Sequence, residues 1–153
     1  MFSRYDMIGI NYITARREAG MDDMFIYVNN KPGEDYYEFH NLLGGTDYIF
    51  RMFLPESFPY DTPNLLLVSP KDLPGYQNDK PLSQIGCSHN FHINGVIKGS
   101  IDICYHSASW KPDSCISLLV LKAILWCDAY NKYLKDGKSI DMHLSEIRGQ
   151  INE

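Results

Sequence analysis

The sequence predicts an α+β domain, in which helices and strands occupy separate parts of the chain. Three observations lead to this prediction: a capped helical segment near the start, several segments with a period of two residues, and one long apolar stripe with a helical period. The 153 residues, of which 44% are hydrophobic and 13% aromatic, are enough for one core and too few for two. We therefore expect a single domain over residues 1–153.

The first helix is expected to start at Ser3 and to end near Gly20. Ser3 is a favourable N-cap residue with Asp6 three positions later, and basic residues precede Gly20, a combination typical of a helix with both ends marked. Residues 7–13 alternate almost as well as they follow a helical period, so a strand is the alternative for this segment.

Four segments with a period of two residues predict strands. They are rich in β-branched, aromatic and other apolar residues and cover Phe25–Val28, Tyr36–Leu43, Tyr48–Leu54 and Asn64–Val68. Residues 29–33 and 44–47 have strong turn compositions, which favour hairpins between consecutive strands. The economical topology is a four-stranded antiparallel meander.

The second half of the chain is expected to be irregular first and helical afterwards. Residues 69–91 predict a long surface excursion, and an active-site loop should follow it. A long central helix is predicted over Ser114–Lys135, with Asp113 or Ser114 as its cap, Gly137 at its end and a first half that is buried nearly all round. Ser139 should then cap a short C-terminal helix.

Charge and hydropathy exclude several classes of function. The net charge of −5 offers no cationic field for a nucleic acid. The most apolar stretch, residues 116–127, is shorter than the roughly 20 residues that cross a bilayer, so we expect no membrane partner. The first residues are too polar for a secretory signal, and the four cysteines are expected to be reduced thiols. These observations favour a cytoplasmic setting.

Residues 89–112 combine the groups that covalent thiol chemistry requires. Cys104 supplies a nucleophile, Asn94 an amide donor for a developing oxyanion, and Asp102 or His106 an acid or base. Simpler interpretations stay open: a lone cysteine is often inert core, His106 can be a solvated loop residue, and Asn94 with Gly95 is a good turn dipeptide.

Several motifs of this chain occur in a characteristic order. They are Leu54-Pro55-x-x-Phe58-Pro59-x-x-x-Pro63, His92-Ile93-Asn94, Gly99-Ser100-Ile101, Ile103-Cys104, Trp110-Lys111-Pro112 and a long helix that carries Trp126 and ends at Gly137. In this order they resemble the catalytic fold of ubiquitin-conjugating enzymes, most of all its bacterial branch. The resemblance covers nearly the whole chain and implies a UBC-like fold.

The resemblance implies that Cys104 accepts a ubiquitin-like modifier protein as a thioester and passes it to an amine. The chain has no phosphate-binding loop and needs no cofactor, so a separate ATP-dependent activating enzyme would supply the modifier, with a ligase as an optional third partner. The implied catalytic residues are Cys104, Asn94, His92, Asp102 and His106. The implied partner contacts are Tyr60, Pro63, Pro112 and Asp113 toward a ligase, and Arg16 and Arg17 toward the activating enzyme.

Two other functions are compatible with the same residues. In the eukaryotic enzymes the nucleophile follows the tripeptide asparagine by eight positions, which here gives Asp102 (94 + 8), so the chain could be an inactive variant that binds a modifier. A zinc site is the second alternative, with Cys87, His89, His92, Cys104 and His106 as candidate ligands. Their spacing is unusual for zinc, and we expect no metal. A cysteine hydrolase is also conceivable, but this chain contains no motif specific to that class.

Overall fold

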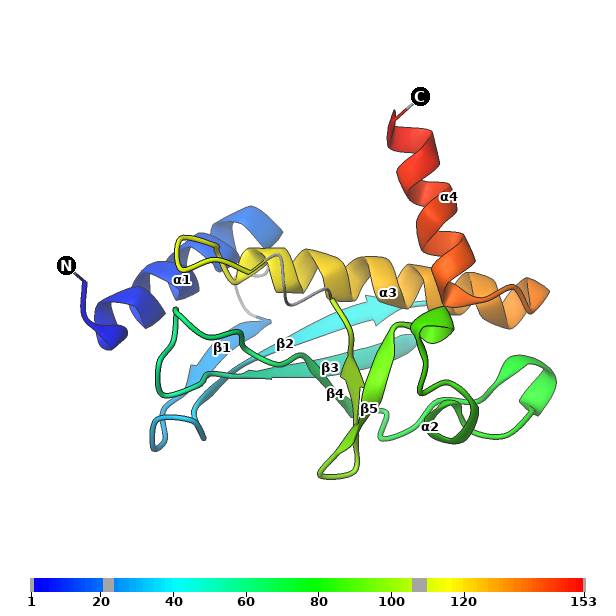
Figure 1. The fold of residues 1–153 in the computed structure, drawn as a ribbon, viewed down its shortest axis with the longest axis horizontal. Coiled ribbons are helices and arrows are strands. Elements are labelled where there is room, and N and C mark those ends of the chain that lie inside the picture. The colour runs from blue at the N-terminus through cyan, green and yellow to red at the C-terminus, as the bar shows by residue number, and fades with distance from the viewer. Residues whose placement is uncertain (1, 21–23, 106–109, 153) are drawn as a thin grey trace.

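The computed structural model describes residues 2–20, 24–105 and 110–152, over which the chain forms one antiparallel sheet with helices on one face (Figure 1). The strands lie in the order β1-β2-β3-β4-β6-β5. They are β1 (Phe25–Val28), β2 (Tyr36–Leu43), β3 (Thr46–Phe53), β4 (Leu66–Ser69), β5 (Ile93–Ile97) and β6 (Ser100–Ile103). The helices are α1 (Arg4–Ala19), α2 (Leu82–Ile85), α3 (Ser117–Asp136) and α4 (Ile140–Asn152), with the 3-10 turns η1 (Tyr76–Asn78) and η2 (His89–Phe91). The α+β class is thus confirmed.

Helix α1 begins with a capping box. The Ser3 hydroxyl accepts a hydrogen bond from the Asp6 amide, and the Asp6 carboxylate accepts one from the Ser3 amide, both at 3.1 Å. Gly20 follows the helix in the left-handed conformation that commonly ends helices. The predicted helix is confirmed and the strand alternative for residues 7–13 is wrong.

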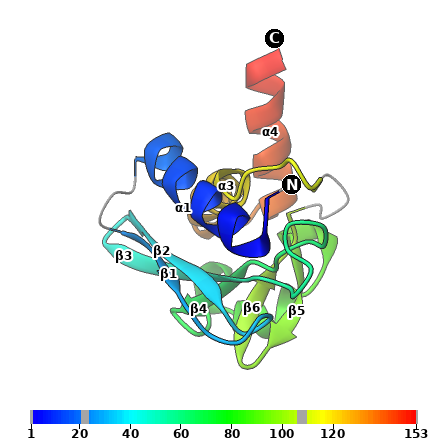
Figure 2. The same ribbon diagram turned by 90° about the vertical axis from the view of Figure 1, so that its left-hand side faces the viewer.

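Helices α1 and α3 lie side by side over the same face of the sheet, as Figure 2 shows. The core lies between these helices and the sheet. Phe25, Phe39 and Phe50 come from three neighbouring strands, are fully buried, and have ring centroids 6.3 and 5.2 Å apart. Strands β1 and β2 have the predicted bounds, and β3 and β4 begin within two residues of the predicted starts.

A hairpin stands where the sequence predicted an irregular active-site loop. Strands β5 and β6 pair from Ile93↔Ile103 to Ile97↔Ser100, and β6 also pairs with β4. The two turn residues, Lys98 and Gly99, both have positive φ (50° and 78°), which is the backbone of a tight type I′ hairpin turn. The prediction of four strands is therefore wrong: the sheet has six strands over the described residues.

Helix α3 starts three residues later than predicted and without a side-chain cap. The amide of Ile116, just before the helix, instead donates a hydrogen bond to the Asn11 side chain of α1 at 2.7 Å. Leu121 and Leu125 are 46% and 42% exposed, so the prediction that the first half is buried all round is wrong. Gly137 ends the helix as predicted, with φ 74°.

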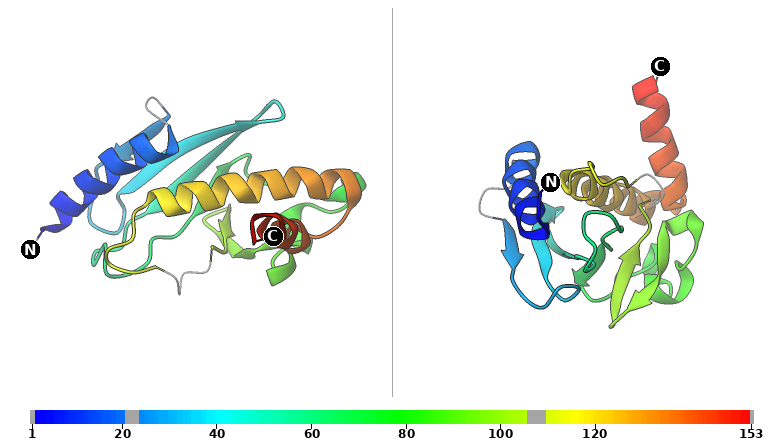
Figure 3. Two further views of the ribbon diagram at one scale, coloured as in Figure 1. Left: turned by 90° about the horizontal axis from the view of Figure 1, so that it is seen from above. Right: turned by 60° about the vertical axis from the view of Figure 1, so that its left-hand side comes forward.

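Helix α4 projects from the body near the end of α3, and Figure 3 shows this from above and from the side. The Met142 amide donates to the Ser139 hydroxyl at 3.2 Å, so the predicted cap is confirmed. Before β5, the predicted surface excursion contains η1, α2 and η2. Within the described ranges, every helix is too short or too polar to cross a membrane.

Candidate functional site

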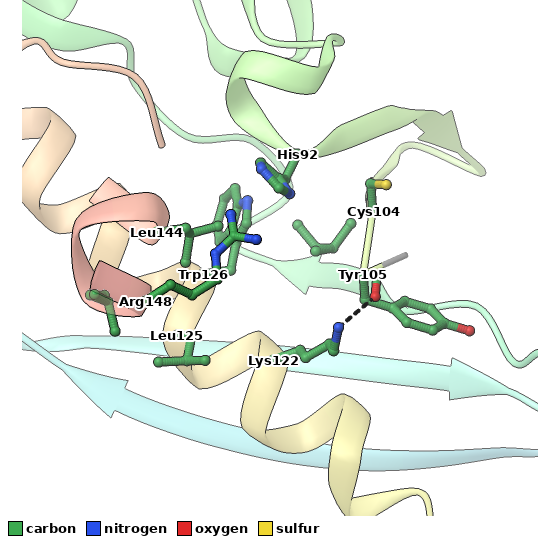
Figure 4. A pocket seen from close by; sticks show the side chains of 10 residues that line it. His92, Cys104, Tyr105, Lys122, Leu125, Trp126, Leu144 and Arg148 are labelled. Carbon is green, nitrogen blue, oxygen red and sulfur yellow. Dashed lines mark hydrogen bonds between the residues drawn. The ribbon is translucent and has the colours of Figure 1, made fainter. Parts of the chain in front are cut away.

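A groove of about 180 Å³ lies between α3, the base of α4 and the chain that leaves β6 (Figure 4). Its walls are mainly apolar, but they include two cationic side chains, Lys122 and Arg148. The lining residues are His92, Ile103, Cys104, Tyr105, Lys122, Leu125, Trp126, Leu144, Ile147 and Arg148. The groove is the place where a reactive side chain of this chain can meet an extended ligand.

Cys104 lies at the wall of this groove and is half-buried. Its amide donates a hydrogen bond to the His92 carbonyl at 2.8 Å, which extends the β5–β6 ladder by one residue beyond Ile103. Cys127, by contrast, is buried in the core, and burial raises the pKa of its thiol to about 12. Of these two thiols, Cys104 is the one that a reagent can approach.

Lys122 and Arg148 are groove residues that the sequence analysis did not identify. The Lys122 ammonium donates to the Tyr105 carbonyl at 2.9 Å (Figure 4). Burial lowers the pKa of Lys122, and the nearby Arg148 lowers it further. Lys122 interrupts the apolar face of α3 in the sequence, and this interruption was the only signal that could have indicated its role.

His92 is buried, and its imidazole points toward α4. Its Nε2 atom lies 2.7 Å from Asp141 Oδ1, and its backbone has positive φ at the end of η2. The neighbouring Phe91 carbonyl accepts a hydrogen bond from the Trp126 indole at 2.9 Å. These contacts fix the carbonyl of His92 and, through it, the position of Cys104.

Asn94 and Asp102 form a hydrogen-bonded pair across β5 and β6. Asn94 Nδ2 donates to Asp102 Oδ2 at 3.4 Å. Burial raises the pKa of Asp102, while the hydrogen bond from Asn94 acts in the opposite direction. The two residues thus lie together, as the proposed chemistry requires, but neither lines the groove at which Cys104 stands. His106 lies outside the described residues.

The predicted ligase contacts are only partly exposed. Tyr60, Pro112 and Asp113 are exposed, and their two segments are joined by a hydrogen bond from the Trp110 indole to the Pro59 carbonyl at 2.8 Å. Pro63 is buried, and its carbonyl accepts a hydrogen bond from the Tyr105 hydroxyl. Pro63 therefore offers little surface to a partner in this structure.

The predicted contacts to an activating enzyme lie on the last turns of α1. Arg17 is exposed there, and the guanidinium of Arg16 lies 5.1 Å from the centroid of the Tyr12 ring. Arg16 is half-buried by this contact, so Arg17 is the more accessible of the two.

Four of the five candidate zinc ligands lie in the described part of the chain, and these four do not form one cluster. His89 and His92 come together, but with Asp141 of α4 as their third member. Cys87 is exposed, and its thiol donates to the Ser83 carbonyl at 3.2 Å. Asp141 is separated from His92 by 49 residues, and no local spacing in the sequence could have indicated this contact.

Comparison with models of protein families, with curated proteins and with solved structures gave no match for this chain. The resemblance to ubiquitin-conjugating enzymes therefore stays a prediction that depends on the motifs in the sequence.

Proposed function

We propose that the protein is a thioester carrier, which accepts a ubiquitin-like modifier on Cys104 and passes it to an amine. The observation that supports this most is the position of Cys104: a half-buried thiol at the wall of a groove, held by a backbone hydrogen bond to His92. An open groove can accept the extended C-terminal tail of a modifier protein, which brings its terminal acyl carbon to the thiol.

In the first step the Cys104 thiolate attacks the thioester carbonyl that the activating enzyme presents. A new bond forms between the acyl carbon and Cys104 Sγ, and the bond to the donor's sulfur breaks, so the donor leaves as a thiolate. This exchange consumes no further energy because the acyl group arrives already activated. Arg148 and Lys122 place positive charge at the groove walls, where it can attract the negatively charged groups of a bound ligand.

In the second step an amine attacks the same acyl carbon, and negative charge develops on the carbonyl oxygen. When this intermediate collapses, the amide bond is complete, the bond from the acyl carbon to Cys104 Sγ breaks, and Cys104 leaves as a thiolate. Asn94 lies on β5 two residues after His92, the residue whose carbonyl holds the Cys104 amide, at a bulge between the pairs Ile93↔Ile103 and Gly95↔Asp102. Its side-chain amide can donate to the oxyanion, and the carboxylate of Asp102 can accept the amine proton. A raised pKa makes Asp102 a stronger base than an ordinary carboxylate.

Within this mechanism His92 is a positioning residue. Its imidazole is paired with Asp141, and its carbonyl holds the amide of Cys104. Tyr60, Pro112 and Asp113 would present the surface for a ligase, and Arg17 the surface for the activating enzyme.

A modifier-binding module without transfer activity is the second candidate. The Asn94–Asp102 hydrogen bond favours it, because a carboxylate at position 102 already engages the amide that would otherwise serve the oxyanion. In this function the groove would hold the modifier tail and Cys104 would not react.

The two functions differ in a covalent adduct. The protein is mixed with ubiquitin that carries a C-terminal thioester to a small thiol, and separately with ATP, an activating enzyme and ubiquitin, and the products are separated on a non-reducing gel. The carrier function predicts a 1:1 adduct that disappears on addition of a reducing thiol. The adduct should be lost in Cys104→Ala.

Cys87→Ala is the matched control, because Cys87 is the exposed thiol of the chain and should be dispensable. An adduct that persists in Cys104→Ala contradicts the assignment of the nucleophile. If the wild-type chain forms no adduct while a known conjugating enzyme is charged in the same mixture, the carrier function is wrong and the binding module is favoured.

A further inference from the structure

His89, His92 and Asp141 form a cluster of potential metal ligands beside the groove, and His92 belongs to both. One potential ligand atom from each residue lies within 4.8 Å of the other two. His89 Nε2 is 3.4 Å and His92 Nε2 is 2.7 Å from the same carboxylate oxygen, Oδ1 of Asp141. His89 begins η2, His92 directly follows it, and Asp141 lies in the first turn of α4.

The two imidazoles lie side by side. His89 is the first residue of η2, and His92 directly follows this turn in the left-handed conformation, with φ 52°. Their ring centroids are 4.8 Å apart. The pair is thus presented as one surface to the helix that carries Asp141.

We propose that these three residues bind a divalent transition-metal ion, for which zinc is the best match. Two imidazoles and one carboxylate are nitrogen and oxygen ligands of the types that zinc uses. Zinc–ligand distances of about 2.0–2.1 Å in a tetrahedron correspond to a ligand–ligand separation of about 3.3 Å. The separation of 3.4 Å between His89 and Asp141 has this value, and His92 needs to move away from Asp141 by about 0.6 Å.

Burial and charge are consistent with such a site. His92 is 5% exposed at its side chain, Asp141 29% and His89 67%, so the cluster opens to solvent on one side and is closed on the other. A metal ion can therefore enter beside His89, and the three protein ligands leave one tetrahedral position for water. The ion would join α4 to η2, where His92 and Asp141 already form a hydrogen bond.

The proposal changes the ligand set that the sequence suggested for zinc. His89 and His92 remain, Asp141 is added, and neither cysteine takes part, since the Cys87 thiol donates to a backbone carbonyl and Cys104 lies at the groove. The proposal is independent of the thioester chemistry: metal binding can be measured on the chain alone, whether or not Cys104 reacts.

The test uses the full chain, freed of metal with a chelator and titrated with zinc chloride in a calorimeter. We expect one zinc ion per chain and a rise in the thermal unfolding midpoint. Loss of an outer hydrogen-bond partner of a ligand weakens metal binding by about 10–100-fold, so His89→Ala, which removes a ligand, should cost at least about tenfold in affinity. His89 is exposed, so this variant should fold normally.

Two control variants make the result specific. His40→Ala removes another histidine that is paired with a carboxylate, Asp47 at 2.9 Å, and it should leave zinc affinity unchanged. Cys87→Ser should also bind zinc as the wild type does. Cobalt chloride gives an independent readout: tetrahedral nitrogen and oxygen ligands give visible d–d bands without a thiolate charge-transfer band.

The proposal is overturned if the wild-type chain does not bind zinc, or if His89→Ala and Asp141→Asn bind it as tightly as the wild type. A thiolate-to-cobalt band, or loss of binding in Cys87→Ser, would overturn the ligand set. Circular dichroism of each variant establishes that a loss of affinity does not come from loss of the fold.

Discussion

The side chain of Asn94 has one hydrogen-bond partner, Asp102, in a bond that is long at 3.4 Å. A bond at this distance is weak and can be exchanged for a shorter one, because N–H···O bonds are strongest near 2.9–3.0 Å. An oxyanion that forms at Cys104 can therefore compete with Asp102 for the amide. This competition decides whether position 94 serves the reaction or only the hairpin.

Asn94→Ala tests this role. We expect the variant to accept ubiquitin on Cys104 as the wild type does, because the donor thioester is already activated. Transfer from the charged protein to free lysine should be slower by on the order of 100-fold, the usual cost of losing a preorganised oxyanion donor. The measurement is a single-turnover discharge assay on purified charged protein. An unchanged discharge rate together with lowered thermal stability would assign Asn94 to the hairpin alone.

Asp35 is a second residue whose chemistry can be tested, in this case for stability. Its carboxylate is fully buried and accepts hydrogen bonds from the Arg4 guanidinium at 2.8 and 2.9 Å and from the Tyr27 hydroxyl at 2.8 Å. Burial by itself raises the pKa of Asp35, but these hydrogen bonds outweigh it and hold the pKa below its ordinary value of 3.8. A lowered pKa means that folding stabilises the charged carboxylate.

Arg4→Met removes the cation and leaves this carboxylate buried without its main partner. The free energy of unfolding should fall by about 3–5 kcal/mol at pH 7, the usual cost of breaking a buried pair. The contribution of the pair is present above pH 3.8 and is lost as the pH falls through the lowered pKa, so the difference between variant and wild type should shrink in acid. Urea denaturation at pH 7 and pH 3 measures both values.

Arg17→Met is the control, because Arg17 is exposed on the same helix. It should change the free energy of unfolding by less than about 0.5 kcal/mol. An equal effect of the two variants would contradict the prediction.

At the scale of elements, the sequence predicts those whose signals are local. Ser3, Asp6 and Gly20 mark both ends of α1, and the alternation of Phe25–Val28 and Tyr36–Leu43 gives the bounds of β1 and β2. The β5–β6 hairpin was missed although Lys98-Gly99 is a possible turn dipeptide, because the polar residues around it resemble a loop. The start of α3 was misplaced because its first free amide is satisfied by Asn11, 105 residues away. Contacts of this range have no signature in one sequence.

For the candidate site too, only the residues with local signals in the sequence could be predicted. Cys104, Asn94 and Asp102 could be proposed from residue types and spacing, and the structure brings the last two together. Lys122, Arg148 and Asp141 could not, because they reach the site from α3 and α4 through the packing of the whole domain. Chain topology decides such neighbours, and it was the least accurate part of the prediction.

Two glycines, one inside a helix and one just after a helix, should respond in opposite ways to alanine. Gly9 lies in the middle of α1, and a Cβ atom added there would meet nothing within 4 Å. Gly9→Ala should therefore raise the free energy of unfolding by about 0.5–1 kcal/mol, since alanine favours the helix. At Gly137, φ is 74° and the added Cβ would lie 2.8 Å from Tyr76 Cε1.

Gly137→Ala is the matched comparison, with the same chemical change in an incompatible backbone. It should lower stability by more than Gly9→Ala raises it, because both strain and the clash with Tyr76 oppose it. Urea midpoints of the two variants give the comparison. A stabilising effect at Gly137 would contradict the left-handed end of α3. A destabilising effect at Gly9 would contradict the open helical position of this residue in α1.

At the scale of the whole molecule, the groove is built from parts of unequal stability. One wall comes from β6 and α3, which belong to the central core, and the other from Leu144 and Ile147 of α4. Helix α4 is docked by its first turns, where Ile140 and His143 are buried, while Ser145, Glu146, Arg148 and Gly149 are exposed (Figure 1). Elements with few buried contacts open at lower free energy than the core.

Native-state hydrogen exchange should resolve this difference. Amides of Phe39 and Phe50, at the centre of the sheet, are expected to exchange only through global unfolding, and their opening free energy should fall with low concentrations of urea. Amides of residues 145–149 should exchange faster, through local opening that is nearly independent of urea because little surface is exposed. If the amides of α4 are as protected as those of β3 and respond equally to urea, the helix is a cooperative part of the core. The groove would then be a rigid slot, whereas the expected result makes α4 a movable wall that can adjust to the ligand at Cys104.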